Sequence, residues 1–292
     1  MEERYIVGLG EALWDVLPEG KKLGGATTNF AYHASQIMGC DNAMAISALG
    51  NDDLADETEK SLVEHNLRFI MPRVTYQTGT VHVTLSGDGI PTYEIKENVA
   101  WDNIPMTDDI EQVARHCRAV CFGSLAQRSA KSRTFIRHFI ELTPDDCLKI
   151  FDINLRQNYY SLEVIEESIR RCNILKINDE ELVEISRLFE LTATGDEAKC
   201  RFVMEKYGLE ILILTCGTEG SYVFTADETL FRPTPKVEVA DTVGAGDSFT
   251  AAFVASILDG EAVAEAHRKA VATSAYYVCT QSGAMPTHPQ RF

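Results

Sequence analysis

Hydrophobic and polar positions alternate along the chain with two different periods. Short apolar runs predict buried strands, whereas apolar residues spaced three and four apart predict amphipathic helices. The strands are expected at 5–10, 43–48, 118–122, 148–153, 173–177 and 211–216. The helices are expected near 28–39, 54–66, 108–116, 129–142, 161–171, 179–190, 196–207, 247–258 and 261–280. Repeated alternation of strand and helix is typical of an α/β protein whose parallel sheet carries helices on both faces.

One region departs from this alternation. Residues 74–96 alternate with period two and contain Ser86-Gly87-Asp88-Gly89, which predicts a β-hairpin with no helix after it. Residues 12–23 are also strand-like and rich in turn residues. We expect one domain, 1–292, with a small β-sheet inserted from about 12–24 and 72–101. Because so few strands cannot cover their own apolar face, the sheet should act as a lid over a cleft or pack against a partner subunit.

Composition adds limits on location. The chain has 292 residues, 45% hydrophobic and 24% charged, as in an ordinary globular protein. No apolar run approaches the ~20 residues of a membrane helix, and MEERYIVGLG lacks the features of a secretory signal. The eight cysteines include no C-x-x-C pair and mostly have apolar neighbours, as reduced core thiols do. A cytoplasmic protein without membrane contact is therefore expected.

Net charge limits the ligands. The formal charge of −17 argues against nucleic acid, since binding a phosphate backbone depends on Lys and Arg. A small anionic ligand is compatible with this charge if local donors and a metal cation offset the repulsion.

The strongest candidate for chemistry is "DTVGAGDSFTAAF", 241–253. The helix that follows is apolar all round and so should be buried, while its first turn offers unpaired N–H groups and the positive end of the dipole. Gly244, Ala245 and Gly246 would let a phosphate approach those donors closely. Asp247 would then lie beside the phosphate, where a carboxylate can take a proton from an attacking hydroxyl. The alternative is a glycine-rich turn in which Asp247 only complements the dipole.

The two common phosphate-binding motifs, the dinucleotide-binding turn and the P-loop, are both absent from the sequence. "GLGEAL", 8–13, begins like a dinucleotide-binding turn, but Leu13 replaces the third glycine and Pro18 and Gly20 oppose a following helix. No G-x-x-x-x-G-K-[ST] sequence occurs, so a P-loop is also excluded. Residues 244–247 are left as the leading phosphate site.

A second segment suggests a pocket for a hydroxylated ligand. In "LGGATTNFAYHASQIMG", Gly24 and Gly25 permit close backbone approach, and Asn29 is expected to open a helix. With the carboxylate of Asp15, these groups could bind sugar hydroxyls. The alternative is a loop followed by a capped core helix. Arg156, at the end of "DINLR", could contact a hydroxyl or phosphate or could be a solvated loop residue.

Two further segments follow predicted strands. Asn178 and Glu181 have the spacing of a helix capping pair, which is equally suited to holding a hydrated cation near a phosphate tail. In "TCGTEGSYVF", 215–224, Gly217 and Gly220 form a turn between two strands that could border a nucleotide. Asn178 and residues 215–220 and 244–247 all lie at or after the carboxyl ends of strands, where open α/β sheets bind ligands.

Two of these motifs carry a resemblance to a known family. Gly24-Gly25-x-x-x-Asn29 and Asp241-Thr242-x-Gly244-Ala245-Gly246-Asp247 resemble the signature regions of ribokinase-like, phosphofructokinase-B (PfkB) type carbohydrate kinases. The resemblance covers essentially the whole chain. Within the family, "GEALWDVLPEGKKLGGATTNFAYHAS" and "NVAWDN" are most similar to bacterial fructokinases. The family resemblance implies a three-layer α/β/α sandwich with a mainly parallel sheet and a small β-sheet lid that often forms a homodimer interface.

The resemblance also implies roles for individual residues. Asp247 would be the catalytic base, and the backbone of Gly244, Ala245 and Gly246 would form the anion hole. The sugar would be held by Asp15, Gly24, Gly25, Asn29 and Arg156. The nucleotide, ATP, would be bordered by Asn178, Thr215, Gly217 and Gly220. Glu181 would act on Mg²⁺ indirectly, and a monovalent cation such as K⁺ would be bound near Asp241, Val243 and Gly283.

The chain departs from the family pattern at two places. Thr27-Thr28 replaces the Pro-Ala common in fructokinases, and Val243 stands where ribokinases often have threonine. Transfer of the γ-phosphoryl of ATP to fructose is the favoured reaction. Ribose, a keto-deoxy sugar acid, a sugar phosphate or a nucleoside are alternative acceptors. A non-catalytic sugar or nucleotide sensor is the alternative of a different class.

Overall fold

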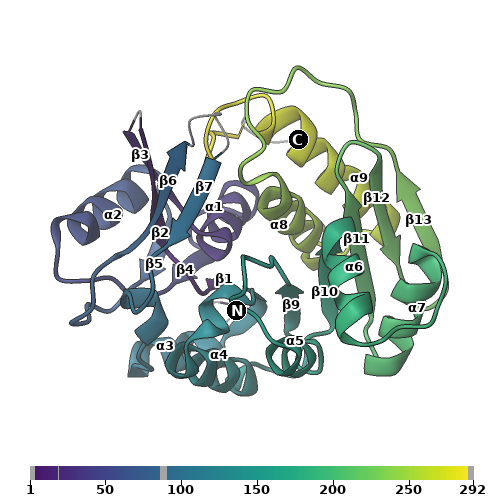
Figure 1. Ribbon diagram of the computed structural model, residues 1–292, viewed down its shortest axis with the longest axis horizontal. Coiled ribbons are helices and arrows are strands. Elements are labelled where there is room, and N and C mark those ends of the chain that lie inside the picture. The colour runs from purple at the N-terminus through teal and green to yellow at the C-terminus, as the bar shows by residue number, and fades with distance from the viewer. Residues whose placement is uncertain (1–3, 19, 86–90, 289–292) are drawn as a thin grey trace.

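The computed structural model describes residues 4–18, 20–85 and 91–288. Within them, a central sheet has the strand order β13-β12-β11-β10-β9-β8-β1-β4-β5 (Figure 1). All neighbouring strands from β5 to β11 pair in parallel, and β12 and β13 add an antiparallel edge. The strands are β1 Tyr5–Leu9, β4 Ala43–Ile46, β5 Arg68–Ile70, β8 Cys117–Phe122, β9 Leu148–Asp152, β10 Ile174–Asn178, β11 Ile211–Cys216, β12 Gly220–Phe224 and β13 Thr229–Arg232.

Helices cover both faces of this sheet. One face packs against α3 Asp108–Arg115, α4 Ala130–Leu142, α5 Leu162–Ile169, α6 Asp179–Leu188 and α7 Asp196–Tyr207. The other face packs against α1 Ala26–Met38, α2 Asp53–Glu64, α8 Ala245–Leu258 and α9 Val263–Ala272. The predicted three-layer α/β/α sandwich with a mainly parallel sheet is confirmed.

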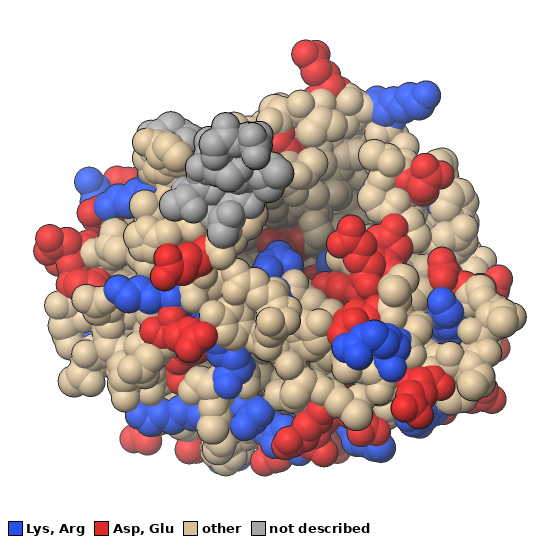
Figure 2. Space-filling view, in the orientation of Figure 1, with Lys and Arg blue, Asp and Glu red and all other residues tan. Residues whose placement is uncertain are grey.

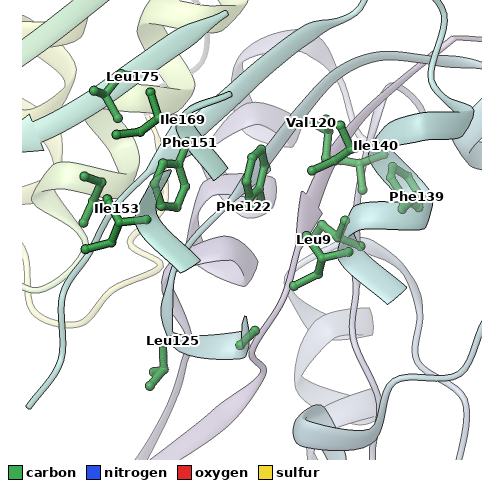
Figure 3. Packing of buried hydrophobic residues seen from close by; sticks show 14 of the residues in the cluster. Leu9, Val120, Phe122, Leu125, Phe139, Ile140, Phe151, Ile153, Ile169 and Leu175 are labelled. Atoms are coloured by element: carbon green, nitrogen blue, oxygen red, sulfur yellow. The ribbon is translucent and has the colours of Figure 1, made fainter. Parts of the chain in front are cut away.

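The core explains why the central strands are apolar along their whole length. Phe122 at the end of β8 and Phe151 on β9 are both fully buried, and their rings stack with centroids 5.3 Å apart (Figure 3). Each buried ring of this kind stabilises the fold by about 1.5–3 kcal/mol. Because helices cover both faces, side chains of either orientation are buried, and the strands read as continuous apolar runs.

A second sheet, of order β3-β2-β6-β7, lies to one side of the main body in the described part of the chain (Figure 1). Its strands are β2 Leu13–Leu17, β3 Gly20–Gly24, β6 Gly79–Leu85 and β7 Pro91–Ile95. They fall inside the two segments expected to form an inserted sheet, and β6 and β7 pair antiparallel as the hairpin prediction requires. The turn expected at 86–89 lies outside the described residues.

The small sheet is anchored to the main body around Trp101. A Cβ on Gly79 of β6 would lie 2.2 Å from the Trp101 Nε1, so only glycine fits there. The Arg128 guanidinium lies 4.0 Å from the Trp101 ring centroid and forms a buried ion pair, 2.8 Å long, with Asp102. These contacts fix the base of the small sheet against the sandwich.

Some local predictions were wrong. The strands β5 and β13 were not expected, because runs of three and four residues are too short to show a clear period. The first helix begins at Ala26, not at Asn29, because Gly25 with φ of 114° ends the preceding strand and forms the helix N-cap. The last helical window, 261–280, changes to a π-helical turn at Thr273–Val278.

Membrane insertion finds no support in the helices. In the described part of the chain, no helix is both long enough and apolar enough to cross a bilayer.

Candidate active site

An open cleft of about 1820 Å³ lies between the small sheet and the carboxyl ends of the central strands. Figure 2 shows it as the hollow of this face, with both acidic and basic side chains inside it and acidic ones on its rim. The volume exceeds the ~300–1,000 Å³ of a pocket for one small ligand, so two ligands can be accommodated. The expected site residues that line it are Asp15, Gly25, Asn29, Arg156, Asn178, Glu181, Thr215, Gly217, Gly220, Asp241, Val243, Gly244, Ala245, Gly246 and Asp247.

The N-terminus of α8 forms the middle of the cleft. Gly244 is its N-cap with φ of 79°, a left-handed conformation, and a Cβ there would lie 2.8 Å from the Ala284 carbonyl oxygen. The Ala245 N–H donates to the Thr242 carbonyl at 3.2 Å. No described residue accepts a hydrogen bond from the N–H groups of Gly246 and Asp247. The helix therefore presents two free donors and the positive end of its dipole to the cleft.

Asp247 stands in the first turn of α8 and is fixed by Asn29 of α1. The Asn29 Nδ2 donates to the Asp247 Oδ2 at 2.8 Å. Burial and the nearby negative charge of Asp152 raise the pKa of Asp247 to about 6, although the Asn29 bond and the charges of Lys176 and Arg156 act in the opposite direction. The carboxylate is thus ionised at neutral pH and has a higher proton affinity than an exposed aspartate.

A buried lysine lies under the α8 N-terminus. The Lys176 Nζ donates to the Asp152 Oδ1 at 3.0 Å, and both side chains are less than a tenth exposed. Thr250 Oγ1 donates to the other Asp152 oxygen at 3.2 Å. A Cβ on Gly246 would lie 3.1 Å from the Lys176 Nζ, so this glycine leaves space for the ammonium. Burial alone would lower the pKa of Lys176, but the charges of Asp152 and Glu181 raise it and keep the ammonium protonated.

The Lys176–Asp152 pair was missed in the sequence, although a signal was present. Lys176 interrupts the apolar strand "ILKIN", and Asp152 ends the strand "LKIFD". A charged residue inside a buried strand is costly without a partner, so each lysine or aspartate of this kind predicts a functional or paired group.

The small-sheet side of the cleft carries two further carboxyl groups. Asp15 lies on β2, and a Cβ on Gly24 would lie 3.1 Å from its Oδ2, so Gly24 makes room for Asp15 and does not itself line the cleft. Burial raises the pKa of Asp15, whereas the charges of Arg156 and Lys22 act in the opposite direction. Glu11, which the sequence did not single out, is 2% exposed, and burial raises its pKa to about 7.

Glu11 also organises the start of α1. Its Oε1 accepts the Ala26 N–H at 3.2 Å, and its carbonyl oxygen accepts the hydroxyls of Thr27 and Thr28. A Cβ on Gly25 would lie 2.3 Å from that carbonyl oxygen. Gly25 is therefore required for packing, and the two threonines act as structural contacts of the β1–β2 loop.

Arg156 is held at the mouth of the cleft by a loop bound to the small sheet. Asn154 and Gln157 both have positive φ, near 47° and 48°, and so shape a tight loop after β9. The Gln157 Nε2 donates to the Tyr93 carbonyl oxygen of β7 at 2.7 Å. Arg156 is exposed, and its positive charge acts on the carboxyl groups of Glu11, Asp15 and Asp247.

The remaining expected residues border the other half of the cleft. Asn178 and Glu181 form the predicted capping box of α6, each side chain accepting the other's backbone N–H at 2.7 and 2.8 Å. Glu181 Oε1 also accepts the Leu155 N–H at 2.9 Å. Thr215 lies at the carboxyl end of β11, Gly217 lies in the predicted turn, and Gly220 is the first residue of β12.

Asp241 ties two loops together beside α8. Its Oδ1 accepts the Val243 N–H at 3.0 Å, and its Oδ2 accepts the Gly283 N–H at 3.0 Å. Partial burial would raise the pKa of Asp241, but these N–H donors lower it below its usual range. Gly283 does not line the cleft, and its neighbour Ala284 does.

The chain matches known proteins over nearly its full length. Residues 18–291 match the pfkB family carbohydrate kinase model. A fructokinase of Salmonella typhimurium is 29% identical over 263 residues, which cover 85% of this chain and 83% of the relative. An ATP-dependent 6-phosphofructokinase of Thermoanaerobacterium thermosaccharolyticum is also 29% identical, over 268 residues covering 88% of this chain and 79% of the relative.

The fold has close counterparts among solved structures. The crystal structure of a Xylella fastidiosa fructokinase with bound ATP superposes with a TM-score of 0.83 at 19% identity, covering 98% of this chain and 96% of that one. Likeness at this identity concerns the fold alone, whereas the family match includes the cleft residues around Asp247. The resemblance noted in the sequence is thereby confirmed, and the chain belongs to the pfkB family of carbohydrate kinases.

Proposed function

We propose that this protein transfers the γ-phosphoryl of ATP to a hydroxyl of a sugar, with fructose the favoured acceptor. The observation that carries the proposal is Asp247 beside the two free N–H donors of α8, in a cleft large enough for two ligands. A carboxylate beside phosphate donors is a poor phosphate ligand but a suitable base for an attacking alcohol. A non-catalytic sensor would have no use for that base.

In the proposed reaction, the sugar hydroxyl oxygen forms a bond to the γ-phosphorus as the bond between that phosphorus and the β–γ bridging oxygen breaks. Asp247 accepts the hydroxyl proton, and ADP leaves with the electron pair of the broken bond. The N–H groups of Gly246 and Asp247 and the Lys176 ammonium stabilise the negative charge on the transferring group. Preorganised charge and positioning supply most of the rate enhancement in such reactions.

Magnesium would accompany the nucleotide. Both carboxylate oxygens of Glu181 already accept backbone N–H groups, so this residue fits contact with an ion through water. The described residues contain no group of three metal-ligating side chains that could hold an ion alone. This donor set suits Mg²⁺, which keeps several waters and binds substrate phosphates. The ion would supply positive charge to the phosphate oxygens.

The charge of the sugar end favours a neutral acceptor. Three carboxyl groups, those of Glu11, Asp15 and Asp247, line this end, against the cations Arg156 and Lys22. Carboxylates accept hydrogen bonds from hydroxyls but repel a phosphate group. Identity does not decide between acceptors, because the fructokinase and the 6-phosphofructokinase relatives are equally similar to this chain.

A panel of acceptors tests the proposal. With ATP and Mg²⁺, ADP release is measured for fructose, ribose, a keto-deoxy sugar acid, fructose 6-phosphate and a nucleoside, with the Asp247→Asn variant as background. We expect fructose to give the highest kcat/KM. Preference for the phosphorylated sugar would contradict the assignment of the acceptor, and no turnover with any of them would favour a sensor.

Arg156→Ala is expected to lower kcat/KM for the sugar much more than it affects nucleotide binding. The guanidinium acts on the three carboxyl groups of the sugar end, and its loss removes one of the positive charges that offset theirs. We expect kcat/KM for the sugar to fall by about 10–100-fold, the loss of one or two charge-assisted contacts, with KM for ATP nearly unchanged. Steady-state kinetics with each substrate varied in turn measures both. Unchanged KM and kcat for the sugar would show that Arg156 is only a solvated loop residue.

The homodimer expected through the small sheet stays a prediction. Tyr93 on β7 is 54% exposed, which is unusual for a large aromatic side chain, and it marks the outer strand of that sheet as a candidate contact. Sedimentation velocity of the wild type and of Tyr93→Ser measures whether this strand contributes to self-association.

A further inference from the structure

Lys22, on β3 of the small sheet, extends across the cleft to the loops beside α8. Its Nζ lies 3.8 Å from the Asp241 Oδ2 and 3.3 Å from the Ser282 Oγ, to which it donates. Lys22 and Asp241 both line the cleft, and their side chains are 48% and 20% exposed. A single side chain thus connects the small sheet to two loops more than 200 residues further along the chain.

These loops shape the phosphate-binding end of α8. Asp241 joins them through the N–H groups of Val243 and Gly283, and Gly244 packs directly against the Ala284 backbone. Asp241 therefore places a negative charge three residues before the helix N-cap, near the position proposed for the phosphoryl group. A neighbouring cation is needed there, because an unbalanced carboxylate would oppose phosphate binding.

We propose that the Lys22 ammonium supplies this cation from within the chain, in place of a bound monovalent ion. The Asp241 oxygens fit that assignment, since each already accepts a backbone N–H and one of them also faces the lysine. The potassium site that the family resemblance implies near Asp241, Val243 and Gly283 is thereby occupied by a tethered ammonium. The effect on turnover depends on the proposed kinase function, whereas the effect on the loops does not.

The register of the small sheet gives Lys22 a second neighbour. Lys22 pairs with Asp15 across β2 and β3, and its charge acts on the Asp15 carboxyl group. The ammonium therefore stands between the proposed sugar carboxylate and the Asp241 loops.

The neighbouring residue provides a matched control. Lys21 is on the same strand but points to the opposite face, where its Nζ contacts Glu57 at 2.5 Å and lies over the Trp14 ring. Removal of Lys21 deletes the same charge from the same strand without affecting Asp241.

Thermal unfolding of the ligand-free protein tests the proposal. The wild type, Lys22→Met and Lys21→Met are unfolded in potassium chloride and in choline chloride at equal ionic strength. We expect the Tm of the wild type and of Lys21→Met to be independent of the salt. Lys22→Met should have a lower Tm in choline chloride and recover about 2–4 °C with saturable dependence on K⁺, as expected for stabilisation by a bound ligand.

Each outcome decides the proposal. The proposal is overturned if K⁺ raises the Tm of the wild type saturably and by as much as that of Lys22→Met. It is also overturned if the Tm of Lys22→Met does not depend on K⁺. Lys22→Arg, which keeps the charge, should behave as the wild type even if Lys22→Met folds poorly, and a K⁺ response of Lys22→Arg would also count against it. Because no substrate is present, these results stand even if the sugar panel shows no kinase activity.

Discussion

Replacing Asp247 with asparagine is expected to lower kcat by about 10³–10⁴-fold, the upper part of the range for a general base. Asparagine has nearly the same shape, and its Oδ1 can still accept the Asn29 amide that now bonds the carboxylate at 2.8 Å. The free N–H donors of α8 also remain. The variant should therefore bind ATP with nearly unchanged affinity while the chemical step is lost.

Titration calorimetry with ATP and steady-state kinetics check this result. Turnover close to that of the wild type would remove Asp247 from its role as base. A large loss of ATP affinity with intact kcat would assign it to nucleotide binding instead. Either result would require a different account of the cleft.

The pH dependence of the wild type should report the same group. A base must be deprotonated, so kcat/KM should rise with pH through about 6, the value to which burial and Asp152 raise the pKa of Asp247, and then level off. Glu11 is the second carboxyl group of this end with a raised pKa, about 7. If kcat/KM of a Glu11→Gln variant still rises with pH through about 6, the rise is assigned to Asp247.

Asp247→Asn should also be more stable than the wild type at neutral pH. The folded pKa of Asp247 is about 6, above the ordinary value of 3.8, so folding favours the protonated form. The wild type therefore loses stability as the pH rises from 3.8 to about 6, whereas the variant has no carboxyl group that titrates in this window. Discounted for partial exposure, the gain is about 1–2 kcal/mol above that window and absent below it. Urea denaturation at both pH limits measures it and also confirms that the variant is folded.

The strands, the helices and the place of Asp247 in the first turn of a buried helix were predictable because each depends on local pattern. Strands covered on both faces are apolar throughout, and the small residues Gly244, Ala245 and Gly246 predicted the helix N-terminus that α8 has there. The start of α1 was not predictable, because Gly25 acquires its φ of 114° by packing on the Glu11 carbonyl. Similarly, Gly24 leaves space for the Asp15 side chain on the neighbouring strand, a contact that depends on the register of β2 and β3.

The partners of the buried lysine are the clearest case of information absent from local pattern. Lys176 and Asp152 are 24 residues apart on neighbouring strands, and a third residue, Thr250, comes from α8. Their pairing depends on the order of strands in the sheet, which sequence spacing does not specify. The chemistry of the α8 N-terminus thus includes a cation that the glycine-rich motif alone does not contain.

Lys176→Met is expected to reduce kcat by about 10²–10³-fold, the loss typical of one preorganised donor to developing charge. The substitution also leaves the Asp152 carboxylate buried with only the Thr250 hydroxyl as partner. Breaking a buried ion pair in this way costs about 3–5 kcal/mol. Lower activity of this single variant would therefore combine a catalytic loss with a folding defect.

The double variant Asp152→Asn/Lys176→Met separates the two effects. Asparagine keeps an oxygen for the Thr250 Oγ1, and the buried charge of Asp152 is removed together with its partner, so much of the stability should return. If Lys176 only neutralises Asp152, kcat returns with the stability. If the ammonium, which lies 3.1 Å from where a Cβ on Gly246 would be, stabilises the phosphoryl group, the double variant is stable but still slow. We expect the second result, measured as kcat under saturating ATP alongside the free energy of unfolding in urea.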